Sequence, residues 1–447
     1  MSNVARPDDG VHSFFARRAE RIAEALMTPQ LLKELGAFFG PHHRERRFTL
    51  PTMLWLGMFG AANAAMRSME SILSAACAAV EGAACLPLRA GTLTQSGWSR
   101  AKERLSLGLL RRVWRRWIRV ARDCAGQVAL FHGMRLIALD KKTVMVPEAL
   151  WTVFGSHRGC RGEGPAEAEL MVAYDVCVRV PVELTLGRMR ADERVLASRL
   201  LRRLPKPSLM LIDSGFYSIA FFADLERAGH KFVTRMRANG KPKRLRWIGQ
   251  DDGLYEIRGS KQYWEKKDSC VPDSMLVRIV TVAWPGFRTE RLVTSLLDAQ
   301  AFPRADLIDL YHRRWHIETF FRELSSDLHL EHWHTRTLKG LYVELLFHMI
   351  YVSAVRAHMA EAAKGAGVLP GHLSFARGAH ACTRTWCRLG KAPPGGLRML
   401  QTELTRHLAT LKIDIRPDRR FERDTQKRRT KSRRNKLQAL EKQKHAA

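Results

Sequence analysis

In the first part of the chain, apolar positions recur at the intervals of helices. We therefore expect residues 1–125 to be all-helical. The most apolar block, 51–66, is short for a membrane span, includes Asn63 and runs on into charged residues, so it predicts a buried helix. Between residues 99 and 122, arginines interleave with apolar side chains, which predicts a basic amphipathic helix.

Two short apolar runs further along the chain are typical of buried strands. Asp140 follows the run 136–139, and Asp213 follows the run 209–212. Ligand-binding groups collect at strand ends in sheets flanked by helices. We therefore expect each aspartate at the end of its strand and within a candidate site, although aspartate is also common there as a turn or helix cap.

The segments around these runs predict a mixed sheet with helices packed on it. The pattern predicts a hairpin over 169–189, helices over 191–204 and 219–228, a strand over 230–237, short strands within 240–290 and a strand over 291–298.

The stretch from Tyr311 to Ser325 predicts one helix with a polar and an apolar side. At about 100° per residue, Tyr311, Arg314 and Glu318 fall within an arc of about 60°, and Arg322 lies just beyond it. An adjoining arc is apolar and comprises Leu310, Ile317, Phe320, Phe321, Leu324 and Leu328. Taken alone, the charged positions would be typical of a solvated face with ion pairs.

Two aspartates and a glutamate in these positions predict a metal site. If Asp140, Asp213 and Glu318 converge, they can hold a pair of divalent cations of the kind that phosphoryl-transfer enzymes use. Hard oxygen ligands suit Mg²⁺ or Mn²⁺ rather than zinc. The expected chemistry is an attack on a phosphodiester.

The charge of the chain points to a polyanionic partner. Its 447 residues carry a formal charge of +31, from 75 Lys and Arg against 44 Asp and Glu. Ribosome or membrane-surface binding would fit the charge alone, but paired carboxylates favour a nucleic-acid enzyme. Arg112 and Arg116 in the basic helix are candidate DNA contacts, unless they only keep a core helix soluble.

The sequence shows no signal for export and no cysteine pattern typical of a zinc site or of disulfides. The amino terminus lacks an apolar signal core, so we expect a cytoplasmic protein with no membrane attachment. The eight cysteines are scattered and complete neither a zinc site nor a disulfide framework.

These motifs resemble the DDE transposases of bacterial insertion sequences, specifically the insertion element 4 family. The family signature is Tyr, two residues, Arg, three residues, Glu, six residues, Lys, and Tyr311, Arg314 and Glu318 match it. The block 211–218, LIDSGFYS, resembles the stretch around the family's second aspartate. The resemblance extends over residues 30–360.

This sequence departs from the family pattern at two points. The family commonly has Asp-Gly-Thr at the first aspartate, whereas here Asp140 is followed by Lys141 and Lys142. Ser325 stands where the signature has its lysine. Because Ser325 is uncharged, we expect Arg322 to take over part of the lysine's grip on the terminal DNA.

The resemblance implies an α/β protein with an RNase H-like mixed sheet, flanking helices, a β-rich insertion before the catalytic glutamate and an all-helical N-terminal domain. We expect a helical DNA-binding domain over 1–125, a catalytic core over 126–239 and 291–360, a β-rich insertion over 240–290, a helical C-terminal region over 361–415 and a basic, disordered tail over 416–447.

The implied function is cut-and-paste movement of an insertion sequence. Asp140, Asp213 and Glu318 would be the catalytic residues and would hold two Mg²⁺ ions, for which Mn²⁺ can substitute. One ion would activate water and the other would steady the departing 3′ oxygen. Tyr311 and Arg314 would contact phosphates beside the scissile bond. The implied partners are double-stranded DNA, as terminal inverted repeats and target, and a second copy in a homodimer.

Other interpretations stay open. The chain could be a DNA-binding relic with decayed catalysis, or a metal-dependent nuclease without strand transfer. Zinc hydrolysis is disfavoured, because the available histidines match no common zinc spacing; they are His312, His316, His329, His332 and His334. Relatives that cleave through a hairpin hold a flipped base on an aromatic ring, and Trp264 and Trp284 are candidates by location.

Overall fold

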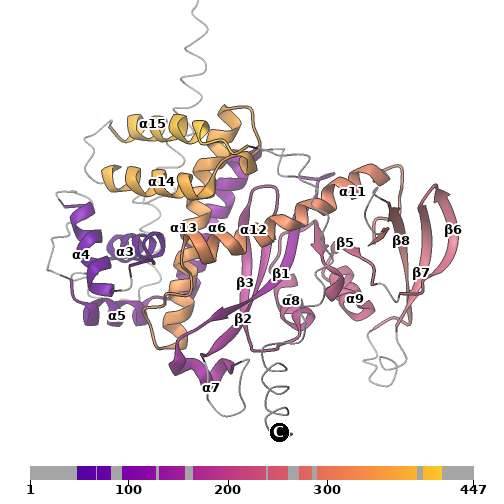
Figure 1. Cartoon of the computed structure of the whole chain (residues 1–447), viewed down its shortest axis with the longest axis horizontal. Coiled ribbons are helices and arrows are strands. Elements are labelled where there is room, and N and C mark those ends of the chain that lie inside the picture. Colours follow the sequence, from indigo (N-terminus) through magenta and orange to yellow (C-terminus); the bar gives the residue numbers. More distant parts are fainter. Residues whose placement is uncertain are drawn as a thin grey trace, which may run out of the picture.

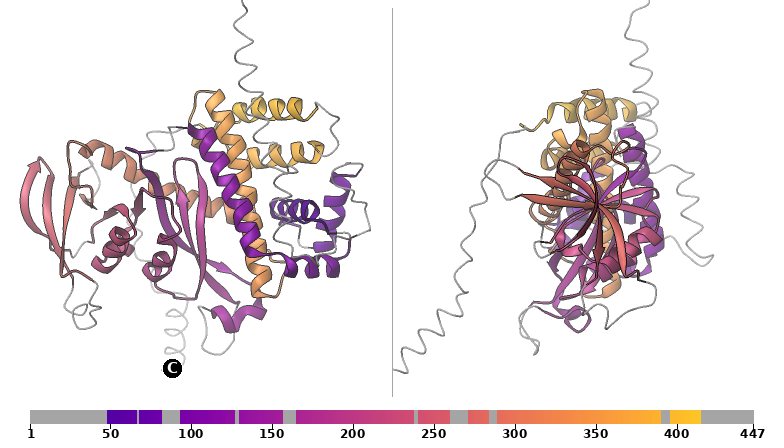
Figure 2. Two further views of the ribbon diagram at one scale, coloured as in Figure 1. Left: turned by 180° about the vertical axis from the view of Figure 1, so that it is seen from behind. Right: turned by 90° about the vertical axis from the view of Figure 1, so that its right-hand side faces the viewer.

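The computed structural model describes residues 48–66, 68–81, 93–126, 130–156, 165–237, 240–259, 271–283, 289–389 and 396–414. Within these ranges, a nine-stranded sheet extends from the middle of the molecule to one side, and most helices gather at the other side (Figure 1). Viewed along its length, the sheet fans out with the twist expected of so many strands (Figure 2). The expected α/β class is confirmed.

The strands form one mixed sheet in the order β3-β2-β1-β4-β5-β9-β8-β7-β6. Their bounds are β1 Arg135–Met145, β2 Glu167–Asp175, β3 Val180–Arg188, β4 Ser208–Ile212, β5 His230–Arg235, β6 Lys243–Gly249, β7 Asp252–Arg258, β8 Ser274–Val282 and β9 Glu290–Thr294. β1, β4 and β5 are parallel neighbours, and the other adjacent strands pair antiparallel.

Helices cover both faces of the central strands. The α-helices have these bounds: α3 Leu50–Ala62, α4 Met69–Ala79, α5 Gln95–Arg104, α6 Leu107–Ala125, α7 Trp151–Phe154, α8 Glu193–Leu201, α9 Ile219–Arg227, α11 Arg304–His312, α12 His316–Arg322, α13 Leu338–Gly365, α14 Phe375–Leu389 and α15 Gly396–Thr410. Short 3₁₀ turns span Glu148–Leu150, Ser214–Phe216, Arg313–Trp315 and Pro370–His372, and a π-helical turn, η5, spans Glu323–Asp327.

Several expected elements are confirmed. The hairpin over 169–189 forms as β2 and β3, and the helices over 191–204 and 219–228 form as α8 and α9. β4 is buried along its whole length, because α-helices pack on both sides of the central sheet. A strand with two covered faces needs apolar residues at every position, which explains its unbroken apolar run.

The helical side of the molecule is built around α13. This helix packs on α6, α3, α14, α15 and β3 (Figure 2). It is the one helix of the described residues that is long and apolar enough to cross a membrane, but most of its apolar window is covered by the rest of the chain. Its apolar composition is therefore that of a core helix. The expected buried helix over 51–66 is confirmed as α3.

The expected basic amphipathic helix forms as α6, but it does not include the first residues of the run 99–122. α5 ends at Arg104, and α6 begins after Ser106, whose hydroxyl accepts a hydrogen bond from the Leu109 amide. A serine with this bond is a typical helix N-cap, so the break has a local cause. α6 buries its two tryptophans, and Trp114 Nε1 donates to Ser353 on α13 at 3.1 Å.

A buried ion pair joins α13 to the segment that follows α12. Arg356 of α13 is 1% exposed, and its Nη2 donates to both carboxylate oxygens of Glu323 at 2.7 and 2.6 Å. The guanidinium also lies over the Phe375 ring, 4.5 Å from its centroid. Because both charged groups are buried away from water, each is stabilised mainly by its interaction with the other.

We predict that Arg356→Met destabilises the protein by about 3–5 kcal/mol, because Glu323 would keep a buried charge without a partner. The change should appear as a lower midpoint in denaturant unfolding. Arg388→Met is the matched control, since its pair with Glu403 is exposed on both sides and is expected to contribute less than about 1 kcal/mol. Equal losses in the two variants would contradict this interpretation.

Candidate active site

Asp140 and Asp213 are brought together by the register of two parallel strands. Ala138 of β1 pairs with Leu211 of β4, and each aspartate lies two residues further along its strand. Neighbouring strands are about 4.8 Å apart, so this register sets the two aspartates side by side. Asp213 directly follows β4, as expected.

The expectation that Asp140 ends its strand is wrong. β1 continues to Met145, because β2 still pairs with it there and Asp140 lies opposite Val172. β4 stops at Ile212, so Asp140 stands where β1 loses its neighbour on one side only. The two carboxylates are still adjacent, as expected, but Asp140 lies within a strand that pairs with β2 on both sides of it.

Side-chain alternation along β1 directs Asp140 toward α12. Lys141 Nζ donates to the Ala191 carbonyl oxygen, just before α8, at 3.0 Å. Lys142 Nζ donates to the Phe321 carbonyl oxygen on α12 at 3.5 Å. Successive side chains of a strand point to opposite faces, so Asp140 shares the face of Lys142.

α12 holds Glu318 over this face of the sheet. The Phe320 ring of α12 stacks on Tyr174 of β2, with ring centroids 4.8 Å apart. Just before α12, the Tyr311 hydroxyl donates to the Ile212 carbonyl oxygen, one residue before Asp213, at 3.2 Å. One contact therefore holds the segment around Glu318 to the end of β4, beside Asp213, and the other holds it to β2, the neighbour of the Asp140 strand.

The expectation of one regular helix over 311–325 is wrong in detail. α11 ends at His312, a 3₁₀ turn follows, and α12 gives way to η5 after Arg322. The i, i+4 pair still forms, with Arg314 Nη2 donating to Glu318 Oε1 at 3.0 Å. Single π-helical turns within α-helices are frequent at functional sites, and this one lies directly after the glutamate's helix.

The carboxylates act on one another electrostatically. Burial raises the pKa of Asp140 to about 7, the charges of Asp213 and Glu318 add to the rise, and the Lys141 amide and Arg314 oppose it. Each of the other two acidic groups is therefore close enough to disfavour the charge on Asp140. A cation placed among them would relieve this repulsion.

The donor chemistry fits a hard divalent cation, although no ready-made cage is present. Among the residues that the structure describes, no three His, Cys, Asp or Glu side chains form a compact metal-binding group. Glu318 is held by Arg314, and Asp213 Oδ1 accepts from the Gly215 amide at 2.7 Å. Carboxylate oxygens suit Mg²⁺ or Mn²⁺, and the Arg314 bridge would open for Glu318 to join them.

Two charged residues at the site were given no role in the sequence analysis. Lys142 Nζ donates to the Ser325 hydroxyl as well as to the Phe321 carbonyl oxygen. The positively charged ammonium group of Lys142 therefore lies beside Ser325. Glu193, at the start of α8, lies so near Gly215 that a Cβ there would approach its Oε1 to 2.2 Å. Burial, and then Asp213, raise the pKa of Glu193. The strand alternation of Asp140 and Lys142 was a signal for the first residue, but nothing local signalled the second.

The other expected DNA contacts have varied surroundings. Arg322 is exposed on α12, and Arg112 is exposed on α6, where Arg116 is half-buried. Tyr311 and Arg314 are each 8% exposed and have partners within the protein. All five assignments stay predictions. Trp264 and Trp284 lie outside the described residues.

Three of the five histidines of the zinc alternative contact backbone carbonyl oxygens. Ring nitrogens of His316, His332 and His334 are within hydrogen-bonding distance of the carbonyl oxygens of Val176, Ala64 and Met66. Burial lowers the pKa of His316 to about 4. Within the described part of the chain these residues gather into no metal site.

Comparisons with known proteins identify the family of the chain. Residues 131–352, which include all three acidic residues, match the family model described as Transposase DDE domain. The chain is 24% identical over 392 residues to Transposase InsG for insertion sequence element IS4 of Escherichia coli (strain K12), covering 85% of this chain and 86% of that protein. A solved piggyBac transposase synaptic complex with hairpin DNA is 12% identical with a TM-score of 0.38, covering 90% of this chain and 88% of that one.

The family match and the relative define the class of protein as DDE transposases, which are enzymes of DNA transposition. The chain belongs to this class and, within it, to the family of the insertion sequence IS4 transposase.

Proposed function

We propose that this transposase moves its insertion sequence by a cut-and-paste route in which Asp140, Asp213 and Glu318 are the catalytic and metal-binding residues. The observation that supports the proposal best is the β1–β4 register, which aligns the two aspartates on neighbouring strands. Glu318 is included with the two aspartates because its charge contributes to the raised pKa of Asp140, so the two carboxylates lie close together.

We also propose an RNase H-like core for the catalytic part. Support comes from the strand order β3-β2-β1-β4-β5, with β1, β4 and β5 parallel and the β2–β3 hairpin antiparallel to β1. In this scheme 126–239 and 291–360 form the core, and β6, β7 and β8 belong to an insertion over 240–290. The regions over 1–125 and 361–415, whose described parts are mostly helical, flank the core, and the basic tail over 416–447 lies outside the described residues.

Asp140, Asp213 and Glu318 would hold two Mg²⁺ ions, with Mn²⁺ as a substitute. When bound, the ions would lower the pKa of an attacking water and stabilise the departing 3′ oxygen. The protein's own part is to fix the aspartates through the sheet and to keep Glu318 paired with Arg314 until it is needed. Once released, the planar guanidinium of Arg314 would be free to grip a phosphate beside the scissile bond.

Lys142 is our candidate for the cation that the family signature places at position 325. Its ammonium group reaches the Ser325 hydroxyl from β1, on the same face as Asp140. A lysine there would offer a point charge to the terminal DNA next to the carboxylates. Arg322, which is exposed on α12, is the competing candidate for the same role.

The partners in this proposal are double-stranded DNA and a second copy of the chain. The DNA would be the terminal inverted repeats in the first step and the target in the second, where the freed 3′-hydroxyl attacks. Each step is an in-line displacement at phosphorus, so one carboxylate site would serve both. A homodimer would hold the two ends together, in the cytoplasm of a bacterium.

We predict that Asp140→Asn, Asp213→Asn and Glu318→Gln each reduce cleavage of a labelled inverted-repeat duplex by at least about 100-fold in Mg²⁺, because each removes a charged oxygen ligand. Duplex binding without metal should persist. Calorimetric titration with Mn²⁺ gives a second readout, in which each variant should bind the ion more weakly than the unaltered protein.

The alternatives give different products. A relic would bind the duplex and leave it uncut, whereas a nuclease would cut it without joining the ends to a target plasmid. Undiminished cleavage by any one of the three variants would remove that residue from the proposal.

We predict that Lys142→Ala weakens binding of the inverted-repeat duplex by about tenfold and lowers its salt dependence by about one contact, because a phosphate-binding cation is lost. Lys142→Arg should restore most of the binding. Lys141→Ala is the matched control, since Lys141 points to the opposite face and lies 3.4 Å from Glu169. A loss with Arg322→Ala and none with Lys142→Ala would assign the role to Arg322 instead.

A further inference from the structure

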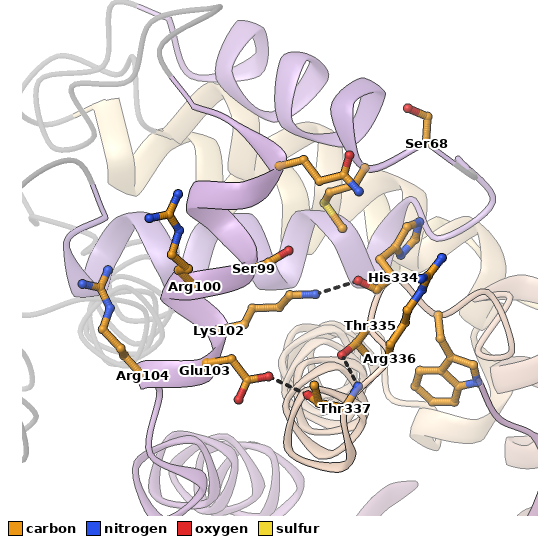
Figure 3. Close-up of a pocket in the computed structure, with 13 residues that line it drawn as sticks. Ser68, Ser99, Arg100, Lys102, Glu103, Arg104, His334, Thr335, Arg336 and Thr337 are labelled. Carbon is orange, nitrogen blue, oxygen red and sulfur yellow. Dashed lines mark hydrogen bonds between the residues drawn. The ribbon is translucent and has the colours of Figure 1, made fainter. Parts of the chain in front are cut away.

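A groove of about 920 Å³ lies between α5 and the segment 333–337, which leads from the active-site helix into α13 (Figure 3). One wall carries Arg100 and Arg104, which are one helical turn apart and project from the same side of α5 (Figure 3). The other wall carries Trp333 and Arg336. The catalytic proposal uses none of these residues.

The groove has an uncompensated positive charge. Arg100, Arg104 and Arg336 are exposed, and in the described ranges no residue forms a hydrogen bond or ion pair with their side chains. The acidic residue of the groove, Glu103, accepts a hydrogen bond from the Thr337 hydroxyl at 2.5 Å. Three free guanidinium groups against one carboxylate leave a net attraction for anions.

The walls of the groove are fixed to each other. Lys102 of α5 is 3% exposed, and its Nζ donates to Glu344 of α13 at 2.5 Å and to the His334 carbonyl oxygen at 3.2 Å. Lys102 is therefore paired with Glu344, and its two hydrogen bonds join α5 to the opposite wall of the groove. The exposed arginines are thus presented on a rigid frame, which lowers the cost of ordering them on a ligand.

One edge of the groove is joined to the strand that carries Asp140. Trp333 Nε1 donates to the Met145 carbonyl oxygen, at the end of β1, at 2.7 Å. Asp140 lies five residues back along the same strand, which corresponds to about 17 Å at about 3.4 Å per residue. Duplex DNA covers this length in about five base pairs.

We propose that this groove binds the sugar–phosphate backbone of duplex DNA about five base pairs from the scissile phosphate. Arginines supply the charge, and the hydroxyl and amide groups of Ser68, Ser99, Gln95 and Thr335 line the same groove. Such a mixture contacts phosphates and fixes register without reading bases. The spacing rests on the proposed function, which puts the scissile phosphate at Asp140, whereas the binding of DNA by the groove does not.

The first test is the salt dependence of binding. The full chain with Arg100→Gln, Arg104→Gln and Arg336→Gln is compared with the unaltered chain, using fluorescence anisotropy of a labelled mixed-sequence duplex over a range of KCl concentrations. The slope of log K against log salt concentration should fall by about 2–3, since each lost phosphate contact removes about 0.9. An unchanged slope would overturn the proposal.

A matched triple variant controls for the loss of charge alone. Arg202→Gln, Arg384→Gln and Arg398→Gln remove the same charge from exposed positions outside the groove, and their slope should change by less than one contact. Both triple variants should keep the thermal midpoint of the unaltered chain, because the groove arginines have no described partner to lose. An equal fall of slope in the two triple variants would contradict a groove-specific contact.

The second test locates the contact on the DNA. Phosphate ethylation interference on an inverted-repeat duplex should give signals at the cleavage position and about five base pairs from it, and the groove variant should lose only the distant signals. Signals lost elsewhere would overturn the spacing. If Asp140→Asn still cleaved DNA, the catalytic proposal would fail, yet the salt slope would still decide whether the groove binds DNA.

Discussion

The parallel register of β1 and β4 is the constraint on which the site depends. It pairs Ala138 with Leu211. The residues two positions further along each strand, Asp140 and Asp213, are therefore neighbours. A slip of one residue would turn one carboxylate to the other face of the sheet. The register is protected because β4 is buried along its length and β2 continues to pair with β1 past Asp140. The buried centre of the sheet thus holds two of the three acidic groups.

Glu318 is held differently, through packing of its helix on the sheet. The stack of Phe320 on Tyr174 seats α12, and the buried Arg356–Glu323 pair connects the following π-helical turn to α13. These contacts fix the helix while the glutamate itself is half-buried and ion-paired. The sheet therefore positions the aspartates, whereas in the proposed mechanism Glu318 would exchange its pairing with Arg314 for a metal ion.

Most strands and helices could be predicted from sequence because burial on two faces leaves an unmistakable apolar run, as in β4. The errors arose where a structure depends on distant partners. β1 extends past Asp140 only because β2, contributed by a later segment, pairs with residues 140–145, and no local pattern shows that. Likewise, Lys142 meets Ser325 across 183 positions of sequence. The break between α5 and α6 is a different case, since the N-cap serine was visible and an overriding amphipathic pattern masked it.

The two departures from the family signature, Lys142 after the first aspartate and Ser325 in place of the lysine, lie next to each other in the structure. A lysine at position 325 would project from the π-helical turn, but here the ammonium group arrives from β1 and meets the Ser325 hydroxyl at that turn. Lys142 lies on a strand that β2 holds in place, two residues from Asp140 and on its face. Burial, together with the charges of Asp213 and Glu318, raises the pKa of Asp140 to about 7, although the charge of Arg314 opposes the rise. If Lys142 takes the role of the signature lysine, as proposed, lysine after the first aspartate and serine on the helix would together leave the net charge of the site unchanged.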